Sequence, residues 1–386
     1  MYLNKSNRFW LSPKKHIAMF FATVLITFSS CSFNSSSLSG DISGVDSDTL
    51  LLVVSDMNSG ERLYSKKVAL ENEHFEIQLS DSALYVSIMA QPKAPNRALR
   101  MPSGGPVFYF PGDRLRVSGS INDLKITGSE LYDDLSKNLD VIRIEREMHL
   151  LNDKLIAAIK ADEKSKIKEY KAKYLAAREE LYDVQFRAIQ ANPNAMSSAY
   201  YATKMKAEEG LKAIKLLSKD VLNGPMGSQI KKAKESFENT IARKKAASYI
   251  KPGNSAPELH LSTIDGKEIT LSAFRGKYLL LDFWGSWCGW CIKGFPDMKK
   301  YYLKYKDQIE FLGISCNDTE KKWRKAVSTH QLPWVNAIEG KSKASVVYAV
   351  CGFPTKILVD PEGKIVEVIV GESPELYKRL DEMFGK

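Results

Sequence analysis

The chain has 386 residues, of which 44% are hydrophobic and 26% charged, and its formal net charge at pH 7 is +10. This length exceeds the usual span of one domain, so two or three globular domains are expected. Four of the 56 Lys and Arg residues and none of the 46 Asp and Glu residues lie in residues 1–31, so the remainder carries +6. That modest excess argues against nucleic-acid binding.

The first 31 residues have the features of an export signal. Four cations, Lys5, Arg8, Lys14 and Lys15, precede an apolar run over 17–26. A basic segment before a short apolar run is typical of a secretory signal, and this run is too short for a comfortable membrane span. The sequence therefore predicts an exported chain.

Cys31 ends this leader and is a candidate for lipidation. The segment Phe28-Ser29-Ser30-Cys31 resembles the bacterial lipobox, in which the Cys becomes the lipidated first residue. The alternative is an ordinary Cys near another kind of cleavage site. Lipidation would give a stable membrane anchor, and the absence of acidic residues from 32–37 favours an anchor that faces the periplasm.

Residues 32–128 are expected to form a small antiparallel β domain. The evidence is the apolar run 49–55, the turn signal 58–60, and the alternation of Phe75, Ile77 and Leu79, which Leu115 and Val117 repeat.

Residues 129–250 are expected to be α-helical. Their clearest apolar stripe steps by three and four residues through Ile167, Tyr170, Tyr174, Ala177, Leu181, Val184 and Ala188. Turn signals at 192–194 and 223–225 divide the region into helices near 130–161, 164–191, 197–222 and 227–249. An apolar stripe favours an intramolecular bundle or spacer over a partner-binding surface, which stays open as the alternative.

A third domain, residues 251–386, is predicted after the linker composition of 251–254 and contains the reactive residues. An apolar run at 278–284 has the length of a buried parallel strand, and Trp287-Cys288-Gly289-Trp290-Cys291 follows it directly before a helical pattern. A helix N-terminus stabilises a thiolate, because its N–H groups are unpaired and carry partial positive charge. This predicts Cys288 as the exposed nucleophile and Cys291 as the thiol that resolves the mixed disulfide.

Three other interpretations of the Cys pair are a zinc site, haem attachment and a structural disulfide. A zinc knuckle needs a second pair of Cys or His ligands at ligand spacing, which the sequence lacks, so no metal site is expected. Haem attachment needs a His where Ile292 stands. A purely structural disulfide stays open, although a loop of two residues stabilises little.

Several motifs in order give residues 255–386, a third of the chain, a resemblance to the thioredoxin superfamily. They are Ala256-Pro257, Asp265-Gly266-Lys267, 271–276, 283–288, Gly352-Phe353-Pro354-Thr355 and 360–364. Within the superfamily the domain resembles the TlpA/ResA-type thiol–disulfide oxidoreductases, which are lipoproteins or membrane-anchored. The preceding β pattern resembles the β-rich domain found before such modules in lipoproteins of Bacteroidetes.

The resemblance implies an α/β thioredoxin-like fold and a redox-active disulfide, Cys288–Cys291, with no other cofactor. It implies that Pro354 is a cis-proline whose backbone pairs with an incoming client peptide, as a strand pairs with a sheet edge. Phe353 should touch the client, and Trp287, Gly289 and Trp290 complete the expected client-binding residues. Pro296 matches a helix-kinking proline of the family.

Asp282 is the candidate base for Cys291. It lies six residues before Cys288, where thioredoxins keep a buried acid beneath the second Cys. A carboxyl within a strand of Leu, Phe and Trp should have a raised pKa and can hold a proton near neutrality. The alternative is an inert Asp that is paired at the end of the strand.

Two residues depart from the family pattern. Relatives commonly carry a Glu three residues after the second Cys, where this chain has Gly294, which predicts a local gap and one acid fewer. That departure weakens the case for a specialised role in cytochrome c maturation. Many relatives have Pro where this chain has Trp290.

The remaining Cys and His residues suggest no further site. Cys316 and Cys351 are expected to be free and mostly buried thiols, because in the family fold the strand that carries Asp282 separates them. The five His residues form no cluster at ligand spacing.

The predicted function is disulfide exchange with exported client proteins in the cell envelope. The expected direction is net reduction, which requires a membrane electron donor because the envelope is oxidising. The alternatives are a disulfide isomerase or oxidase, a thiol peroxidase that uses one isolated nucleophile, and a binding scaffold that keeps the fold without catalysis.

Overall fold

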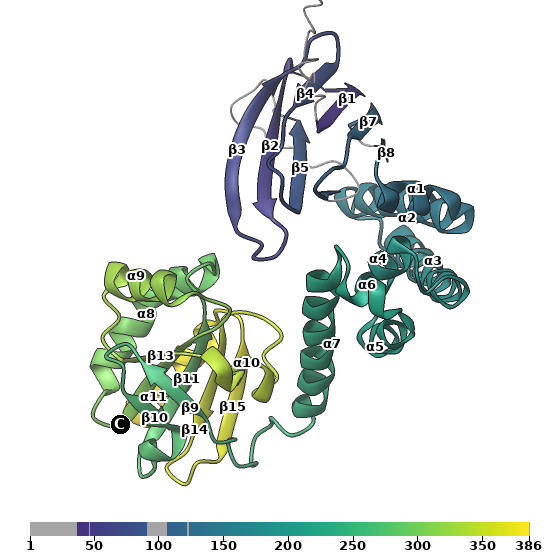
Figure 1. The fold of residues 1–386 in the computed structure, drawn as a ribbon. Coiled ribbons are helices and arrows are strands. Elements are labelled where there is room, and N and C mark those ends of the chain that lie inside the picture. The colour runs from purple at the N-terminus through teal and green to yellow at the C-terminus, as the bar shows by residue number, and fades with distance from the viewer. Residues whose placement is uncertain (1–36, 46, 91–105, 122, 386) are drawn as a thin grey trace, which may run out of the picture.

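The computed structural model describes residues 37–45, 47–90, 106–121 and 123–385. The predicted export signal and Cys31 lie outside the described residues. Among the described helices, none combines the length and apolarity needed to cross a bilayer. Figure 1 shows three regions in chain order: β-sheets, a group of helices, and an α/β domain.

The first region consists of two four-stranded sheets with the orders β4-β1-β7-β8 and β3-β2-β5-β6. Its strands are β1 (Leu38–Ser43), β2 (Thr49–Asp56), β3 (Arg62–Ala69), β4 (His74–Ile77), β5 (Leu84–Ala90), β6 (Val107–Tyr109), β7 (Leu115–Ser120) and β8 (Asp123–Thr127). The pairs are antiparallel apart from β1 with β7, which is parallel. Alternate residues of β5, Leu84, Val86 and Ile88, are buried in the core that the two sheets share.

Seven helices form the second region. They are α1 (Glu130–Lys137), α2 (Leu139–Lys160), α3 (Lys164–Ala191), α4 (Met196–Lys204), α5 (Ala207–Leu216), α6 (Lys219–Asn223) and α7 (Gly227–Ala247). Two helices predicted as continuous are broken: the first at Asn138, whose side chain caps α2, and the third at Lys206 and Ser218, where the backbone is extended. Met57, Phe108 and other residues of the β region belong to the helices' hydrophobic core.

The third region is a seven-stranded sheet with helices on both faces, which confirms the predicted α/β thioredoxin-like class. The strand order is β10-β9-β13-β12-β11-β14-β15. The elements are β9 (His260–Thr263), β10 (Glu268–Thr270), η1 (Leu271–Phe274), β11 (Tyr278–Trp284), α8 (Gly289–Tyr305), β12 (Ile309–Ser315), α9 (Glu320–His330), β13 (Val335–Ile338), η2 (Gly340–Ser342), α10 (Ala344–Val347), β14 (Thr355–Val359), β15 (Ile365–Val370) and α11 (Pro374–Phe384).

The central strand β11 divides its side chains between two cores, because successive residues point to opposite faces of a sheet. Leu280 and Trp284 pack with α8, α9 and α11, whereas Leu281 and Phe283 pack with α10 on the other face. By the same alternation Asp282 faces α8. The sheet therefore places this acid under the helix that begins with the Cys pair.

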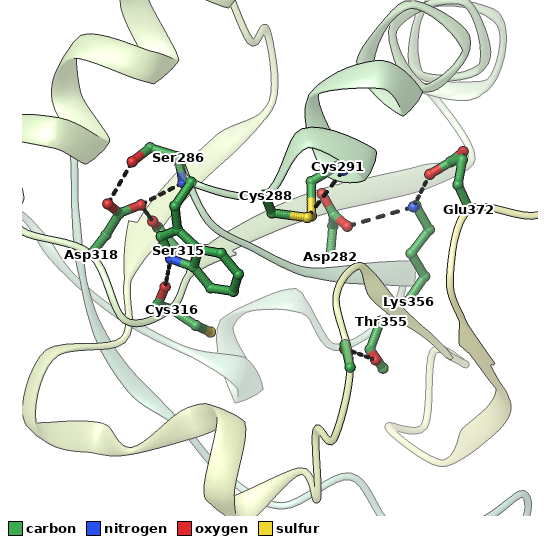
Figure 2. The surroundings of a disulfide bond; sticks show 12 residues. Asp282, Ser286, Cys288, Cys291, Ser315, Cys316, Asp318, Thr355, Lys356 and Glu372 are labelled. Atoms are coloured by element: carbon green, nitrogen blue, oxygen red, sulfur yellow. Dashed lines mark hydrogen bonds and ion pairs between the residues drawn. A yellow bond between two sulfur atoms is a disulfide. The ribbon is translucent and has the colours of Figure 1, made fainter. Parts of the chain in front are cut away.

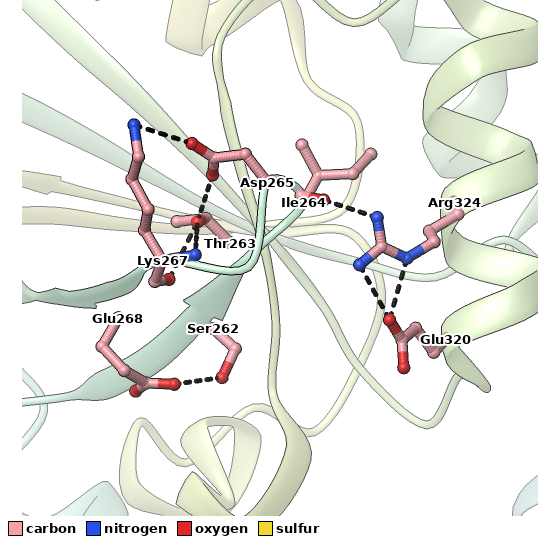
Figure 3. Close-up of polar contacts among 8 residues, drawn as sticks. All are labelled: Ser262, Thr263, Ile264, Asp265, Lys267, Glu268, Glu320 and Arg324. Carbon is pink, nitrogen blue, oxygen red and sulfur yellow. Dashed lines mark hydrogen bonds and ion pairs between the residues drawn. The ribbon is translucent and has the colours of Figure 1, made fainter.

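Polar contacts close the β9–β10 hairpin and join it to α9 (Figure 3). The Thr263 hydroxyl donates to Asp265 Oδ1 at 2.5 Å, and the backbone N–H of Lys267 donates to Thr263 Oγ1 at 3.1 Å. Arg324 of α9 donates to the Ile264 carbonyl and pairs with Glu320 at 2.8 Å. These contacts hold the edge of the sheet that lies away from β11.

Candidate active site around Cys288 and Cys291

The turn between β11 and α8 presents the first cysteine. The backbone N–H of Cys288 donates to the Gly285 carbonyl at 3.0 Å, and Asp318 accepts from both the backbone N–H and the hydroxyl of Ser286, at 2.7 and 2.6 Å. Trp287 Nε1 donates to the Cys316 carbonyl at 3.1 Å. A side chain at position 285 would collide with the Trp287 indole, since an added Cβ would lie 2.5 Å from its Nε1.

Cys288 and Cys291 form a disulfide at the start of α8. Cys288 is the N-cap residue, and its Sγ accepts from the backbone N–H of Cys291 at 3.1 Å. The predicted exposure of Cys288 is wrong for this oxidised form: it is 6% exposed and Cys291 3%. Both sulfurs belong to the core under α8, because Phe295 and Trp284 pack beside them.

A second loop, between α10 and β14, lies against the Cys pair. The bond between Phe353 and Pro354 is cis, as the resemblance implies. Phe353 packs against the core cluster that includes both cysteines, and its ring meets the Trp287 ring edge-on with centroids 5.1 Å apart. This contact joins the proline loop to the residue directly before Cys288.

The predicted client-binding residues differ in exposure. Trp287 and Trp290 are 51% and 65% exposed. Gly289 has open space around it, since an added Cβ would meet nothing within 4 Å. Pro354 is buried and its carbonyl accepts from the backbone N–H of Gly371 at 2.7 Å. The site is thus bordered by two large aromatic surfaces that are available for contact.

Asp282 is buried at the middle of β11, with its carboxyl directed toward the Cys pair (Figure 2). It therefore does not lie at the end of the strand. Burial raises the pKa of Asp282 to about 6, a rise that nearby Glu372 reinforces and Lys356 opposes. Its Oδ1 accepts no hydrogen bond from any residue that the structure describes. Such a carboxyl can accept a proton near neutral pH.

Two charged residues that the sequence analysis did not single out lie beside Asp282. Lys356 is directly opposite Asp282 on β14, and its Nζ lies 3.8 Å from Asp282 Oδ1 and 2.7 Å from Glu372 Oε2. A lone Lys within the buried strand Thr355–Val359 was the available signal for it. Glu372 follows β15 in a short loop, where the sequence gives no such signal.

The gap predicted at Gly294 is occupied. A Cβ at this position would lie 2.3 Å from Glu372 Oε2. The expectation that the site has lost an acid is therefore wrong, because Glu372 places its carboxylate from another element against α8. Pro296 lies inside α8, two residues further along.

Cys316 and Cys351 are both free thiols, as predicted, but only one of them is buried. Cys316 is buried at the end of β12, and burial raises the pKa of its thiol well above the usual value. Cys351 is exposed in the loop before Phe353, so the prediction of burial is wrong for this residue. The loop places it at the surface because it leads out of α10 toward the proline.

In the described part of the chain, no three His, Cys, Asp or Glu side chains are grouped so that they could hold a metal ion. The chemistry that the arrangement offers is carried by the two sulfurs, the buried carboxyl and the positive end of α8.

Comparison with known proteins places relatives in this same region. A family model described as the AhpC/TSA family matches residues 252–368. The thiol–disulfide oxidoreductase ResA of Bacillus cereus is 36% identical over 121 residues, which are 31% of this chain and 70% of that protein. ResA of Bacillus subtilis is 32% identical over 127 residues, 33% of this chain and 71% of that protein.

Among solved structures, the thioredoxin domain of a thiol–disulfide oxidoreductase from Bacteroides vulgatus is 33% identical. The match covers 34% of this chain and 97% of that domain, with a TM-score of 0.33.

Proposed function

The chain belongs to the ResA family of thiol–disulfide oxidoreductases, and on that premise we propose that it exchanges disulfides with exported client proteins through Cys288 and Cys291. The observation that carries this proposal is the position of the pair at the N-terminus of α8. Cys288 is the attacking sulfur, because its thiolate gains the partial positive charge of the helix and the N–H of Cys291. Cys291, one helical turn later, resolves the mixed disulfide.

Client recognition uses the aromatic border and the proline loop. The exposed faces of Trp287 and Trp290 offer apolar contact beside the disulfide. Phe353 touches the client next to Trp287, and the backbone around Pro354 pairs with an extended client segment. The open space at Gly289 lets that segment approach the sulfurs.

Trapping tests this function. A Cys291→Ser variant keeps the attacking sulfur but cannot resolve, so clients should accumulate as covalent complexes that dithiothreitol releases. Cys288→Ser is the matched control and should trap far less. Stronger trapping by Cys288→Ser would reverse the assignment, and no trapping by either variant would defeat the exchange function.

A thiol peroxidase would need one sulfur that reacts with peroxide and is oxidised to a sulfenic acid. The disulfide between Cys288 and Cys291 favours exchange instead. Stopped-flow oxidation of the reduced chain by hydrogen peroxide distinguishes the two: a slow reaction agrees with an exchange enzyme, and a fast reaction with a peroxidase.

The proposed direction is net reduction, with the disulfide as the sole redox group and a membrane electron donor restoring the thiols. Buried Asp282 opposes a second negative charge next to the thiolate, so the reduced form is favoured only moderately. Equilibration with glutathione gives the potential. A value close to about −120 mV, that of strong oxidants, and not nearer the roughly −270 mV of thioredoxin, would favour an oxidase or isomerase.

Anchoring at Cys31 completes the proposal. The basic and apolar leader supports export to the cell envelope, and the lipobox-like segment supports a lipid anchor that faces the periplasm. Labelled palmitate should be incorporated in cells and lost in Cys31→Ala. A wild-type chain without label would defeat the anchor.

A further inference from the structure

Three charged side chains form a row that leads from beneath the Cys pair to the protein surface. Asp282 and Lys356 are cross-strand neighbours, and their side chains are 2% and 1% exposed. Glu372 ends the row at 18% exposure (Figure 2). Burying a charge is costly unless it is paired, so a Lys at this depth depends on the two acids.

The two acids do not share Lys356 equally. Its Nζ hydrogen-bonds Glu372 Oε2 at 2.7 Å, whereas Asp282 Oδ1 lies 3.8 Å away, beyond a hydrogen bond. The ammonium charge is therefore neutralised mainly by Glu372. Asp282 keeps a carboxyl that is neither fully ion-paired nor hydrogen-bonded at Oδ1 within the described residues.

Three elements hold the Glu372 carboxylate in place. The hydroxyl of Tyr377 in α11 donates to its Oε1 at 2.7 Å. Gly294 in α8 leaves room for it, since an added Cβ would lie within 2.4 Å of Glu372 Cδ and Oε2. The neighbouring Gly371 donates its backbone N–H to the Pro354 carbonyl, which ties this loop to the cis-proline.

Glu372 also reaches solvent. It lines a cleft of about 640 Å³ between α8 and α11, with Asp297, Lys300, Tyr301 and Tyr377 among the other lining residues. Asp282 is thus the acid that is shielded from water, and Glu372 is the acid that borders it.

We propose that Glu372 is a positioning residue for disulfide exchange: it holds the Lys356 ammonium away from Asp282, so that the Asp282 carboxylate stays free to take the proton of Cys291. The proposal deepens the proposed function and rests on it. When Cys291 attacks the mixed disulfide, its S–H bond breaks and Asp282 takes the proton. The Cys288–client bond breaks as the Cys288–Cys291 bond forms, and the client sulfur leaves as a thiolate.

Asp282 holds this proton until the disulfide is next reduced, when Cys291 leaves as a thiolate and takes the proton back. Lys356 and Glu372 keep their charges throughout, because 3.8 Å between Lys356 Nζ and Asp282 Oδ1 is too long for direct proton transfer. The other titratable groups that face the row are Cys291 of α8 and Tyr377 of α11, and those around the cleft are Asp297, Lys300, Tyr301, Lys378, Asp381 and Glu382.

The test is the titration of the Asp282 carboxyl in the full chain, measured by NMR with ¹³C-labelled Asp and assigned by its loss in Asp282→Asn. In Glu372→Gln the ammonium loses its counter-charge and turns to Asp282, so the midpoint should fall by about one pH unit. Glu382→Gln is the matched control, because Glu382 lines the same cleft but pairs with Lys378 and Arg379. An unchanged midpoint in Glu372→Gln, or an equal shift in Glu382→Gln, would overturn the proposal.

A kinetic arm tests the effect on resolution. The resolution rate of a preformed mixed disulfide should fall several-fold in Glu372→Gln at pH 7, because Asp282 paired with Lys356 is a weaker base, and the acid limb of the rate should move to lower pH. Glu372→Asp keeps the charge and should recover most of both effects, which a merely structural role would not require. A full wild-type rate in Glu372→Gln would overturn the positioning role. Because the titration needs no client, failed exchange by the wild type would defeat the proposed function and leave the titration result standing.

Discussion

At the scale of single residues, Asp282 destabilises the domain that it serves. Its pKa is about 6 in the folded chain against an ordinary value of 3.8. Between these two pH values the folded chain binds more protons than the unfolded chain, so stability falls as the pH rises through this window. Above about pH 6 the folded chain bears the full free-energy cost of burying the ionised Asp282 carboxylate.

Asp282→Asn should therefore stabilise the third domain at pH 7.5, by up to about 3 kcal/mol, and the gain should vanish below pH 4. Lys356 keeps its 2.7 Å contact with Glu372, so the variant does not leave a buried ammonium alone. Denaturant unfolding followed by Trp fluorescence measures the difference, since all five Trp residues beyond the leader lie between 284 and 334.

Asp265→Asn is the control with the opposite sign. Thr263 and Lys267 hold the pKa of Asp265 at about 2, so its charge favours the folded state above its ordinary pKa. Removal of that charge should bring no gain at pH 7.5. If Asp282→Asn also fails to stabilise the domain at pH 7.5, burial of the Asp282 carboxylate does not have the free-energy cost that its raised pKa implies.

At the scale of elements, the loop before α11 packs against α8 at Gly294. Gly294 disfavours a helix by about 1 kcal/mol relative to Ala, yet an added Cβ would collide with the Glu372 carboxylate. Steric fit with Glu372 thus accounts for Gly294 better than helix propensity does.

Gly294→Ala should destabilise the third domain by about 1–3 kcal/mol, because it displaces Glu372 from Lys356. In a Glu372→Ala background the same change should become neutral or stabilising. A double-mutant cycle by denaturant unfolding measures this coupling. Gly289→Ala is the control in the same helix, since its Cβ meets no atom within 4 Å and should show no coupling to Glu372. Additive effects of Gly294→Ala and Glu372→Ala would contradict the fit.

The elements of the site were predictable to different degrees. The strand and the Cys pair each have a local signal, because neighbouring residues indicate a buried strand and a helix start. The cis form of the Phe353–Pro354 bond was predicted from the family resemblance alone. Asp282 and Lys356 are each visible as a charge within an apolar strand. The proximity of these two residues to Glu372 could not be predicted, because it depends on strand register and on a loop that has no local sequence pattern.

The breaks in the helical region show the same limit. No Pro or Gly marks the ends of α4 and α5, where Lys206 and Leu217 adopt extended backbone. Ser218 caps α6 through its hydroxyl, a signal that is common in loops as well. Both α4 and α5 pack against α3 and α7, and these tertiary contacts have no local signal in the sequence.

At the scale of the whole molecule, the core residues fall into two separate groups. The helices share a hydrophobic core with Met57, Phe108 and Phe110 of the β region. The cores on both faces of the seven-stranded sheet are built from residues between 250 and 384. The first two regions therefore form one packed unit, and the α/β domain forms another.

Polar contacts at the surface join these units. Lys343, directly before α10, lies 3.1 Å from Glu235 Oε1 and donates to Asn239 Oδ1 of α7 at 3.1 Å. The side chains of the ion pair are 47% and 60% exposed. Exposed pairs of this kind contribute about 0.2–1 kcal/mol, so they orient the domain without stabilising it much.

Residues 249–386 alone, which keep Ile250 against the core of the domain, should therefore fold, and their stability should match that of the same domain in the full chain to within about 1 kcal/mol. Trp fluorescence reports this domain in both proteins, so the two unfolding midpoints can be compared directly. Lys343→Ala in the full chain is the control and should change the midpoint as little as removal of residues 1–248 does. A much lower unfolding midpoint in the fragment would mean that contacts with α7 stabilise the α/β domain. If the midpoints agree, a loss of client exchange in the fragment would result from the missing contact between α7 and Lys343. This contact can affect the active site because α10 leads directly into the loop of Cys351 and Pro354.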